Sequence, residues 1–117
     1  MYRDIGILDG TIQLDKRTSL FRANIYLKIE DTSHIDAPSI TVAEKELKDI
    51  AIGGETSPIN FSILFRPKKG NRYELFVHID VDGDGKISIG DYINIISYPI
   101  NFFAFPFSLN VIVSKLE

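Results

Sequence analysis

The chain has 117 residues, 44% hydrophobic and 25% charged, a composition typical of a soluble globular protein with a single domain over residues 1–117. Because it has no cysteine, disulfides, thiolate chemistry and cysteine-based zinc sites are excluded. The formal net charge is −3, with 13 basic against 16 acidic residues, and such a balance disfavours nucleic-acid binding because it provides no broad basic field.

The first half of the chain reads as short strands separated by polar turns. Residues 10–15 alternate between apolar and polar positions, and residues 20–30 alternate more regularly, with Ile25 and Leu27 on the apolar face. A polar loop with His34 follows, and we expect this lone histidine to be a surface residue. Residues 40–50 begin with strand formers but continue with helix formers, so we predict a strand and keep a helix over residues 42–50 as the alternative.

The second half continues in the same way. Strands are predicted over residues 58–65, 73–81, 92–100 and 108–115. The turn 66–72 joins the first two of these strands. Pro67 and Gly70 supply its bend, and it contains four basic residues. A basic turn of this kind is most simply a solvated loop tip, and contact with an acidic partner or a phosphate is the alternative.

Seven alternating segments with frequent turns predict an all-β fold, an antiparallel β-sandwich of about seven strands. We expect its core to contain Ile25, Leu27, Ile63, Val77 and Ile79. Residues 101–107 contain four phenylalanines, which are too many for an ordinary exposed loop. This stretch is interpreted as a plug that closes the core, and an apolar contact surface is the alternative.

One stretch carries specific chemistry. Residues 80–91 read DVDGDGKISIGD, with acids at positions 1, 3, 5 and 12 and Gly85 at position 6. This is the ligand spacing of an EF-hand calcium loop, in which oxygen ligands must converge on one cation. The neighbouring segments alternate as strands do, so the loop is expected to join two strands. The predicted calcium ligands are Asp80, Asp82, Asp84, the carbonyl of Lys86, Ser88 and Asp91.

The loop also departs from the EF-hand pattern. Asp91 stands where a calcium EF-hand usually has a longer Glu, which favours a weaker site or a smaller ion. Ile87 is expected to turn inward, and a hairpin turn without metal is the alternative. His78 and Asp80 share a face of the predicted strand, but no nucleophile, base and orienting group assemble around them. We therefore predict that the protein is not an enzyme.

The sequence resembles the YbaY-like lipoprotein family, which includes the YscW-type pilotins of type III secretion. The resemblance is carried by residues 10–12, 20–27, 30–38 and 42–44, then by 58–61, 73–79, 96–100 and the last strand, with DTSHIDAP and SYP as its most specific parts. It implies a small β-sandwich without enzymatic activity, usually tethered to a membrane by an N-terminal lipidated cysteine. In pilotin members it implies assistance to the assembly of an outer-membrane secretin ring.

Two hypotheses of function follow. The first is a calcium-binding cell-envelope module that binds other proteins, whose identity the sequence does not name. The second is a calcium- or magnesium-regulated intracellular module that also binds proteins. Contact with a membrane is expected only through an N-terminal lipid anchor, so the envelope is the predicted location if a leader and lipidated cysteine were removed, and the cytoplasm otherwise.

Overall fold

The computed structural model describes residues 6–55, 58–100 and 107–117. These residues form strands and no helix, as the sequence predicts. In chain order the strands are β1 (Gly6–Leu14), β2 (Phe21–Asp31), β3 (Ile40–Ile52), β4 (Ile59–Phe65), β5 (Tyr73–Asp80), β6 (Tyr92–Ile93) and β7 (Phe107–Lys115). Residues 40–52 are a strand throughout, so the helical alternative for this segment is wrong.

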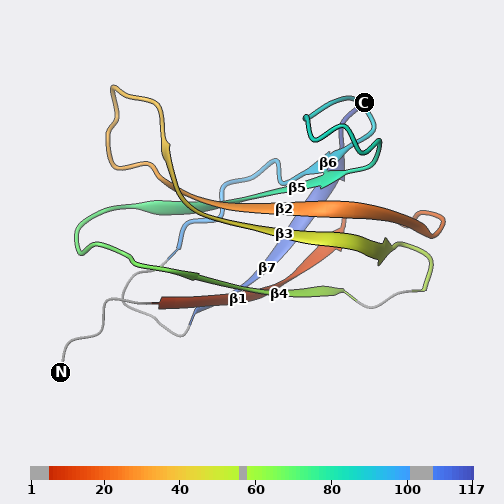
Figure 1. Cartoon of the computed structure of the whole chain (residues 1–117), viewed down its shortest axis with the longest axis horizontal. Coiled ribbons are helices and arrows are strands. Elements are labelled where there is room, and N and C mark those ends of the chain that lie inside the picture. Colours follow the sequence, from red (N-terminus) through yellow and green to blue (C-terminus); the bar gives the residue numbers. More distant parts are fainter. Residues whose placement is uncertain (1–5, 56–57, 101–106) are drawn as a thin grey trace.

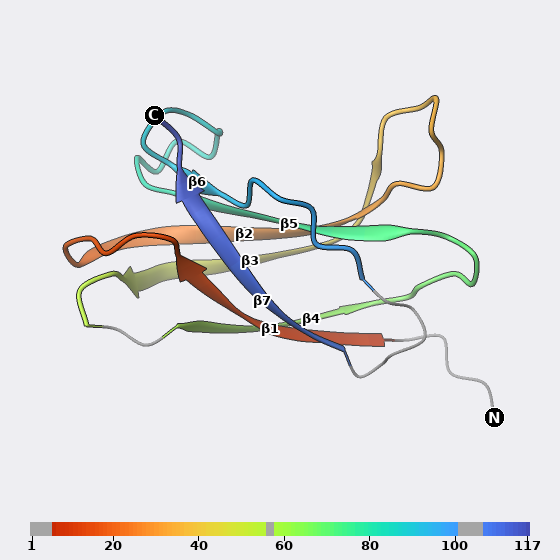
Figure 2. The same ribbon diagram turned by 180° about the vertical axis from the view of Figure 1, so that it is seen from behind.

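The strands form one seven-stranded sheet in the order β3-β2-β5-β6-β7-β1-β4. In Figures 1 and 2, β2, β3 and β5 lie in one layer and β1 and β4 in the other, while β7 crosses between them. β3 and β4, the strands at the two ends of this order, approach each other. Lys45 Nζ on β3 donates a hydrogen bond of 2.7 Å to the carbonyl of Ser62 on β4. The sheet is therefore nearly closed.

The predicted antiparallel sandwich needs a correction. β1 pairs with β4 in the antiparallel sense, but it pairs with β7 in parallel, from Leu8 opposite Phe107 to Leu14 opposite Val113. The fold is thus a single mixed sheet. Gly10 lies at the centre of this arrangement, and a Cβ added there would stand 2.3 Å from the carbonyl oxygen of Leu109. β7 can approach β1 this closely because Gly10 has no side chain.

The core lies between the two layers. The predicted members Ile25, Leu27, Ile63, Val77 and Ile79 are all buried there. They belong to one continuous cluster, which contains inward-facing residues of β1, β2, β4, β5 and β7. β3 contributes Ile52 as its buried member of this cluster. The phenylalanine-rich stretch lies outside the described residues, apart from the backbone of Phe107, which opens β7.

β6 is much shorter than the strand predicted over residues 92–100. The side chain of Asn94 explains this, because its Oδ1 accepts a hydrogen bond of 2.7 Å from the backbone N–H of Val77. Its Nδ2 donates to the carbonyl of Leu75 at 3.3 Å. An amide side chain thus replaces the backbone ladder along β5. Backbone pairing resumes further on, where the N–H of Leu75 donates to the carbonyl of Tyr98 at 3.1 Å.

Candidate metal site

The loop 80–91 connects β5 to β6, so it joins two strands as predicted. It brings together the four predicted acids, since ligand atoms of Asp80, Asp82, Asp84 and Asp91 all lie within 4.8 Å of one another. Asp80 and Asp91 are buried at the ends of the loop, and the other two acids are exposed. The described residues therefore place four carboxylates close together, two of them buried in the protein and two exposed to solvent.

Backbone amides shape the loop around Asp80. Its Oδ1 accepts a hydrogen bond of 3.1 Å from the N–H of Gly83, and its Oδ2 accepts one of 2.7 Å from the N–H of Gly85. Both glycines have a φ of 76°, a left-handed conformation that side chains with a Cβ rarely adopt. Gly85 thus allows the turn that brings its N–H to Asp80.

The remaining predicted ligands are placed as follows. Ser88 Oγ donates a hydrogen bond of 3.1 Å to Asp82 Oδ2, so this hydroxyl lies beside the acids. The N–H of Lys86 donates to Asp84 Oδ1 at 2.9 Å, and the residue is exposed. Ile87 was expected to turn inward and instead is 53% exposed, because the loop stands out from the sheet (Figure 1).

Asp91 is the most enclosed of the four acids, with a side chain 1% exposed. Its Oδ1 accepts a hydrogen bond of 2.9 Å from the N–H of Val81, and its Oδ2 accepts one of 3.2 Å from the N–H of Ser88. His78 Nε2 lies 2.8 Å from the same Oδ2, and because an ionised carboxylate only accepts, the ring N–H is the donor. Val81, Ser88 and His78 therefore already donate hydrogen bonds to this carboxylate.

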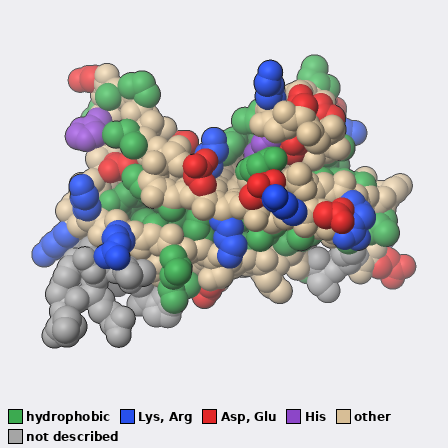
Figure 3. Space-filling view, in the orientation of Figure 1, with side chains coloured by type: hydrophobic (Ala, Val, Ile, Leu, Met, Phe, Trp, Pro, Cys, Tyr) green, Lys and Arg blue, Asp and Glu red, His purple; other side chains and the backbone are tan. Residues whose placement is uncertain are grey.

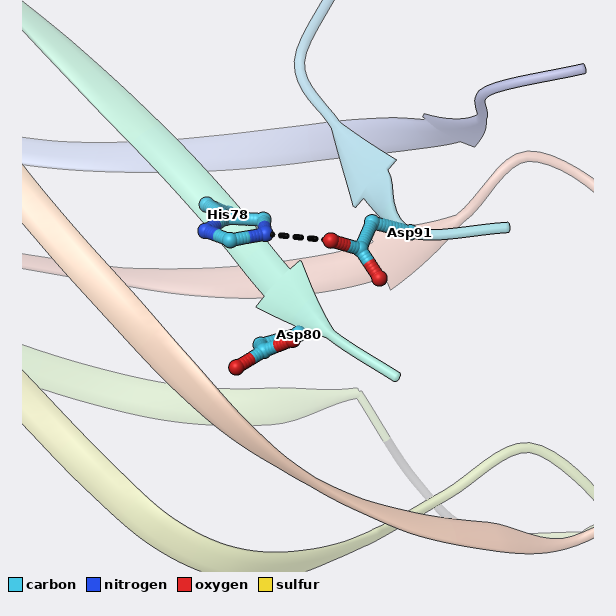
Figure 4. Close-up of side chains that lie close together, drawn as sticks. All are labelled: His78, Asp80 and Asp91. Atoms are coloured by element: carbon cyan, nitrogen blue, oxygen red, sulfur yellow. Dashed lines mark hydrogen bonds and ion pairs between the residues drawn. The ribbon is translucent and has the colours of Figure 1, made fainter. Parts of the chain in front are cut away.

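Sequence reasoning missed the role of His78. His78 is only 5% exposed and lies on β5 between Tyr26 of β2 and Ile93 of β6. Figure 4 shows its ring turned toward Asp91, not paired with Asp80 as the shared strand face suggested. The ring also stacks on Tyr26 of β2, with centroids 5.7 Å apart. The sequence feature that could have indicated this contact is the position of His78, two residues before Asp80, the first acid of the loop.

The acids perturb one another in ways that a cation would relieve. The pKa of Asp80 is raised, chiefly because burial disfavours its charged form and further because Asp82 and Asp91 lie close by. The pKa of Asp82 is lowered, first by its hydrogen bond with Asp80 and then by Asp84 and Ser88. A bound divalent cation would favour the ionised form of every carboxylate in the cluster.

Comparisons with known proteins give two matches. A family model described as "Type III secretion system lipoprotein chaperone (YscW)" matches residues 4–98, in agreement with the resemblance predicted from the sequence. The solved structure of an alternative pilotin from the type II secretion system of Vibrio cholerae is similar in fold, with a TM-score of 0.74 at 19% identity over 97% of this chain and 98% of that chain. No curated protein matches the chain.

The described part of the chain contains no helix long and apolar enough to cross a membrane.

Proposed function

Because the chain belongs to the YscW family of type III secretion system lipoprotein chaperones, we propose that it is a non-enzymatic chaperone of the bacterial cell envelope that binds a protein subunit of a secretion system. The family match over residues 4–98 carries this proposal. The fold shared with an alternative pilotin supports it. The partner that fits this family is a secretin, the subunit of an outer-membrane ring.

The free edge of β3 supports a protein-binding role. Among the described strands β3 forms a backbone ladder only with β2. β4 approaches its centre at Lys45, but the start of β3 bends away from β4 (Figure 1), so the edge there offers backbone N–H and C=O groups. Its first residues include Ile40 and Val42, whose side chains are 58% and 44% exposed. An extended partner segment adds to such an edge through main-chain hydrogen bonds and gains specificity from side-chain contacts. The charged centre of the strand, residues 44–48, discourages pairing between copies of the chain itself.

The chaperone role is tested in the host bacterium. Deletion of the gene is expected to reduce the assembled secretin multimer in the outer membrane, and the intact gene is expected to restore it. An unchanged amount and location of the multimer would refute the proposal. In vitro, the double variant Ile40→Asp/Val42→Asp is expected to lose binding to the purified secretin subunit. Ile112→Asp on β7 is the control, since Ile112 is also 47% exposed but lies away from the β3 edge.

We propose as a second property that the loop 80–91 binds one calcium ion. The carboxylates of Asp80, Asp82, Asp84 and Asp91 would hold it, with the carbonyl of Lys86 and the hydroxyl of Ser88. The close approach of the four carboxylates supports this proposal. The ion would neutralise the acids and brace the connection between β5 and β6.

The hydrogen bonds of Asp91 bear on the affinity of this site. Because His78, Ser88 and Val81 already donate to its two oxygens, Asp91 has fewer free lone pairs to offer than the bidentate Glu of an EF-hand. We therefore expect weak binding, with a dissociation constant of about 10⁻⁵–10⁻³ M, the range of modest sensors and extracellular modules. An envelope protein exposed to external calcium suits that range. The intracellular alternative would need selective binding of calcium or magnesium at cytoplasmic concentrations.

Calorimetric titration of chelator-treated protein tests the calcium site. Calcium at a hundredfold its dissociation constant is expected to add about 2.7 kcal/mol to the free energy of unfolding. Magnesium is expected to compete poorly, because it demands octahedral geometry and dehydrates reluctantly. Asp82→Asn should abolish binding, whereas Asp36→Asn, a control at an exposed acid of the loop 32–39, should not. The absence of both binding heat and thermal stabilisation would reduce the loop to an acidic turn.

A further inference from the structure

The turn between β4 and β5 carries exposed positive charge. Its four cations, Arg66, Lys68, Lys69 and Arg72, are all exposed. The ion pairs within the described ranges join Arg22 to Asp49 and His78 to Asp91, so Lys68, Lys69 and Arg72 have no acidic partner there. These three side chains are available to an external anion.

The turn is held in one shape by hydrogen bonds. The N–H of Lys68 donates to the hydroxyl of the buried Tyr73 at 2.7 Å, and the N–H of Asn71 donates to the carbonyl of Lys68 at 3.1 Å. The N–H of Arg72 donates to Ser33 Oγ at 2.8 Å, which ties the turn to the loop after β2. Because the backbone is already ordered, binding through this turn loses little conformational entropy.

The turn lies at the end of the molecule where β1 begins. Gly6, the first residue of β1, pairs with Phe65, the last residue of β4 before the turn. Next to them Ile7 pairs with Leu64, and both side chains are open to solvent, with exposures of 45% and 62%. An exposed apolar pair thus adjoins the cations. Figure 3 shows Lys and Arg side chains gathered at this end.

The acidic loop lies at the other end of β5. β5 begins after the basic turn and ends at Asp80, and its 8 residues span roughly 26 Å at about 3.3 Å per residue. Figure 3 shows the Asp and Glu side chains of that region on a separate prominence. The basic turn and the acidic loop therefore lie at opposite ends of β5, with the basic turn beside the start of β1.

We propose that this basic end docks on a lipid bilayer with anionic headgroups. Lys68, Lys69 and Arg72 contact the lipid phosphates, while Ile7 and Leu64 enter the interfacial layer. The inference rests on the proposed function, because a lipoprotein is tethered at its N-terminal side and this places the start of β1 next to the bilayer. Anionic membrane surfaces attract cationic side chains, and neighbouring apolar side chains add to the binding by entering the interface. Docking in this orientation directs the loop 80–91 away from the membrane.

Co-sedimentation with vesicles tests the proposal on the 117-residue protein. Binding is expected to vesicles that contain phosphatidylglycerol, to weaken with salt, and to be absent with phosphatidylcholine alone. Lys68→Gln/Lys69→Gln should weaken binding roughly 25-fold, since each lysine near an anionic surface contributes about a fivefold factor. The control is Lys16→Gln/Arg17→Gln, which removes two exposed cations just beyond the opposite end of β1 and should bind like the parent. Leu64→Ser should lower binding at every salt concentration.

Several results would overturn the proposal. An equal loss in the control variant would mean that any cation of the chain attracts the vesicles. Displacement by inorganic phosphate at constant ionic strength would assign the turn to a free anion. Absence of vesicle binding by a protein that still binds its secretin would refute membrane docking and leave the chaperone role standing. Melting curves of each variant show whether it is folded, so a loss of binding is not mistaken for unfolding.

Discussion

The buried pair of His78 and Asp91 is expected to stabilise the fold, and replacing His78 tests this. His78→Ala removes both the hydrogen bond to Asp91 and the ring that stacks on Tyr26. His78→Gln removes the ring but keeps an amide N–H that can reach toward Asp91. The two variants therefore separate the polar contribution from the packing contribution.

The magnitude follows from these contacts. A hydrogen bond to a charged group contributes about 1.5–3 kcal/mol to stability. A stacked ring pair contributes about 0.5–1.5 kcal/mol beyond the area it buries. We therefore expect His78→Ala to lose about 3 kcal/mol and His78→Gln about 1 kcal/mol. In a chain of this size 1 kcal/mol shifts Tm by about 4 °C, so the alanine variant should melt about 12 °C lower.

Urea denaturation and thermal melting of chelator-treated protein measure both values. His34→Ala is the control, because His34 is the second histidine of the chain and is exposed. Calcium is expected to narrow the gap between His78→Ala and the parent, because a cation at Asp91 offsets part of the unpaired charge. Equal losses in the alanine and glutamine variants would refute the hydrogen-bond reasoning and leave only packing of the ring.

Two further predictions concern the scaffold. Gly10→Ala places a Cβ 2.3 Å from the carbonyl oxygen of Leu109, so β7 must shift. Urea denaturation should show that the free energy of unfolding falls by about 2–3 kcal/mol, a loss that the neighbouring control Thr11→Ala does not share. A variant as stable as the parent would contradict the close approach. The pKa of Asp31 is lowered, first by its hydrogen bond with Ser33 and then by Asn71, after a smaller opposing effect of burial. Its contribution to stability is therefore present above the ordinary Asp pKa of about 4 and is lost as the pH falls through the lower folded value. Stability measured against pH should fall less on acidification in Asp31→Asn than in the parent, and parallel curves would contradict this assignment.

Local patterns predicted the strands well and their pairing poorly. The alternation at Ile25 and Leu27 follows from burial of one face, a property of each strand alone, and it was confirmed. The parallel pairing of β1 with β7 joins residues about a hundred positions apart, and no alternation within either strand encodes it. The early end of β6 depends on one side chain, Asn94, whose amide reaches the backbone of another strand.

In the candidate site too, the local features could be predicted from the sequence and the long-range contacts could not. The spacing of the four acids is a local property, and their carboxylates lie close together in a loop between two strands, while calcium binding there stays a prediction. The burial of His78 and its contact with Asp91 depend on how the segment before β6 folds over β5. The outward position of Ile87 has the same origin, since the sequence does not reveal that the loop extends beyond the reach of the core.

The position of β1 between β7 and β4 has a consequence for how the chain acquires its structure. β1 can pair with β4 alone, but it lacks its second neighbour until residues 107–115 exist, so no N-terminal fragment contains the complete sheet. Pairing over such a sequence distance is slow, because a long loop must close before any contact rewards it. The sheet can therefore be completed only after the last strand, β7, has been synthesised.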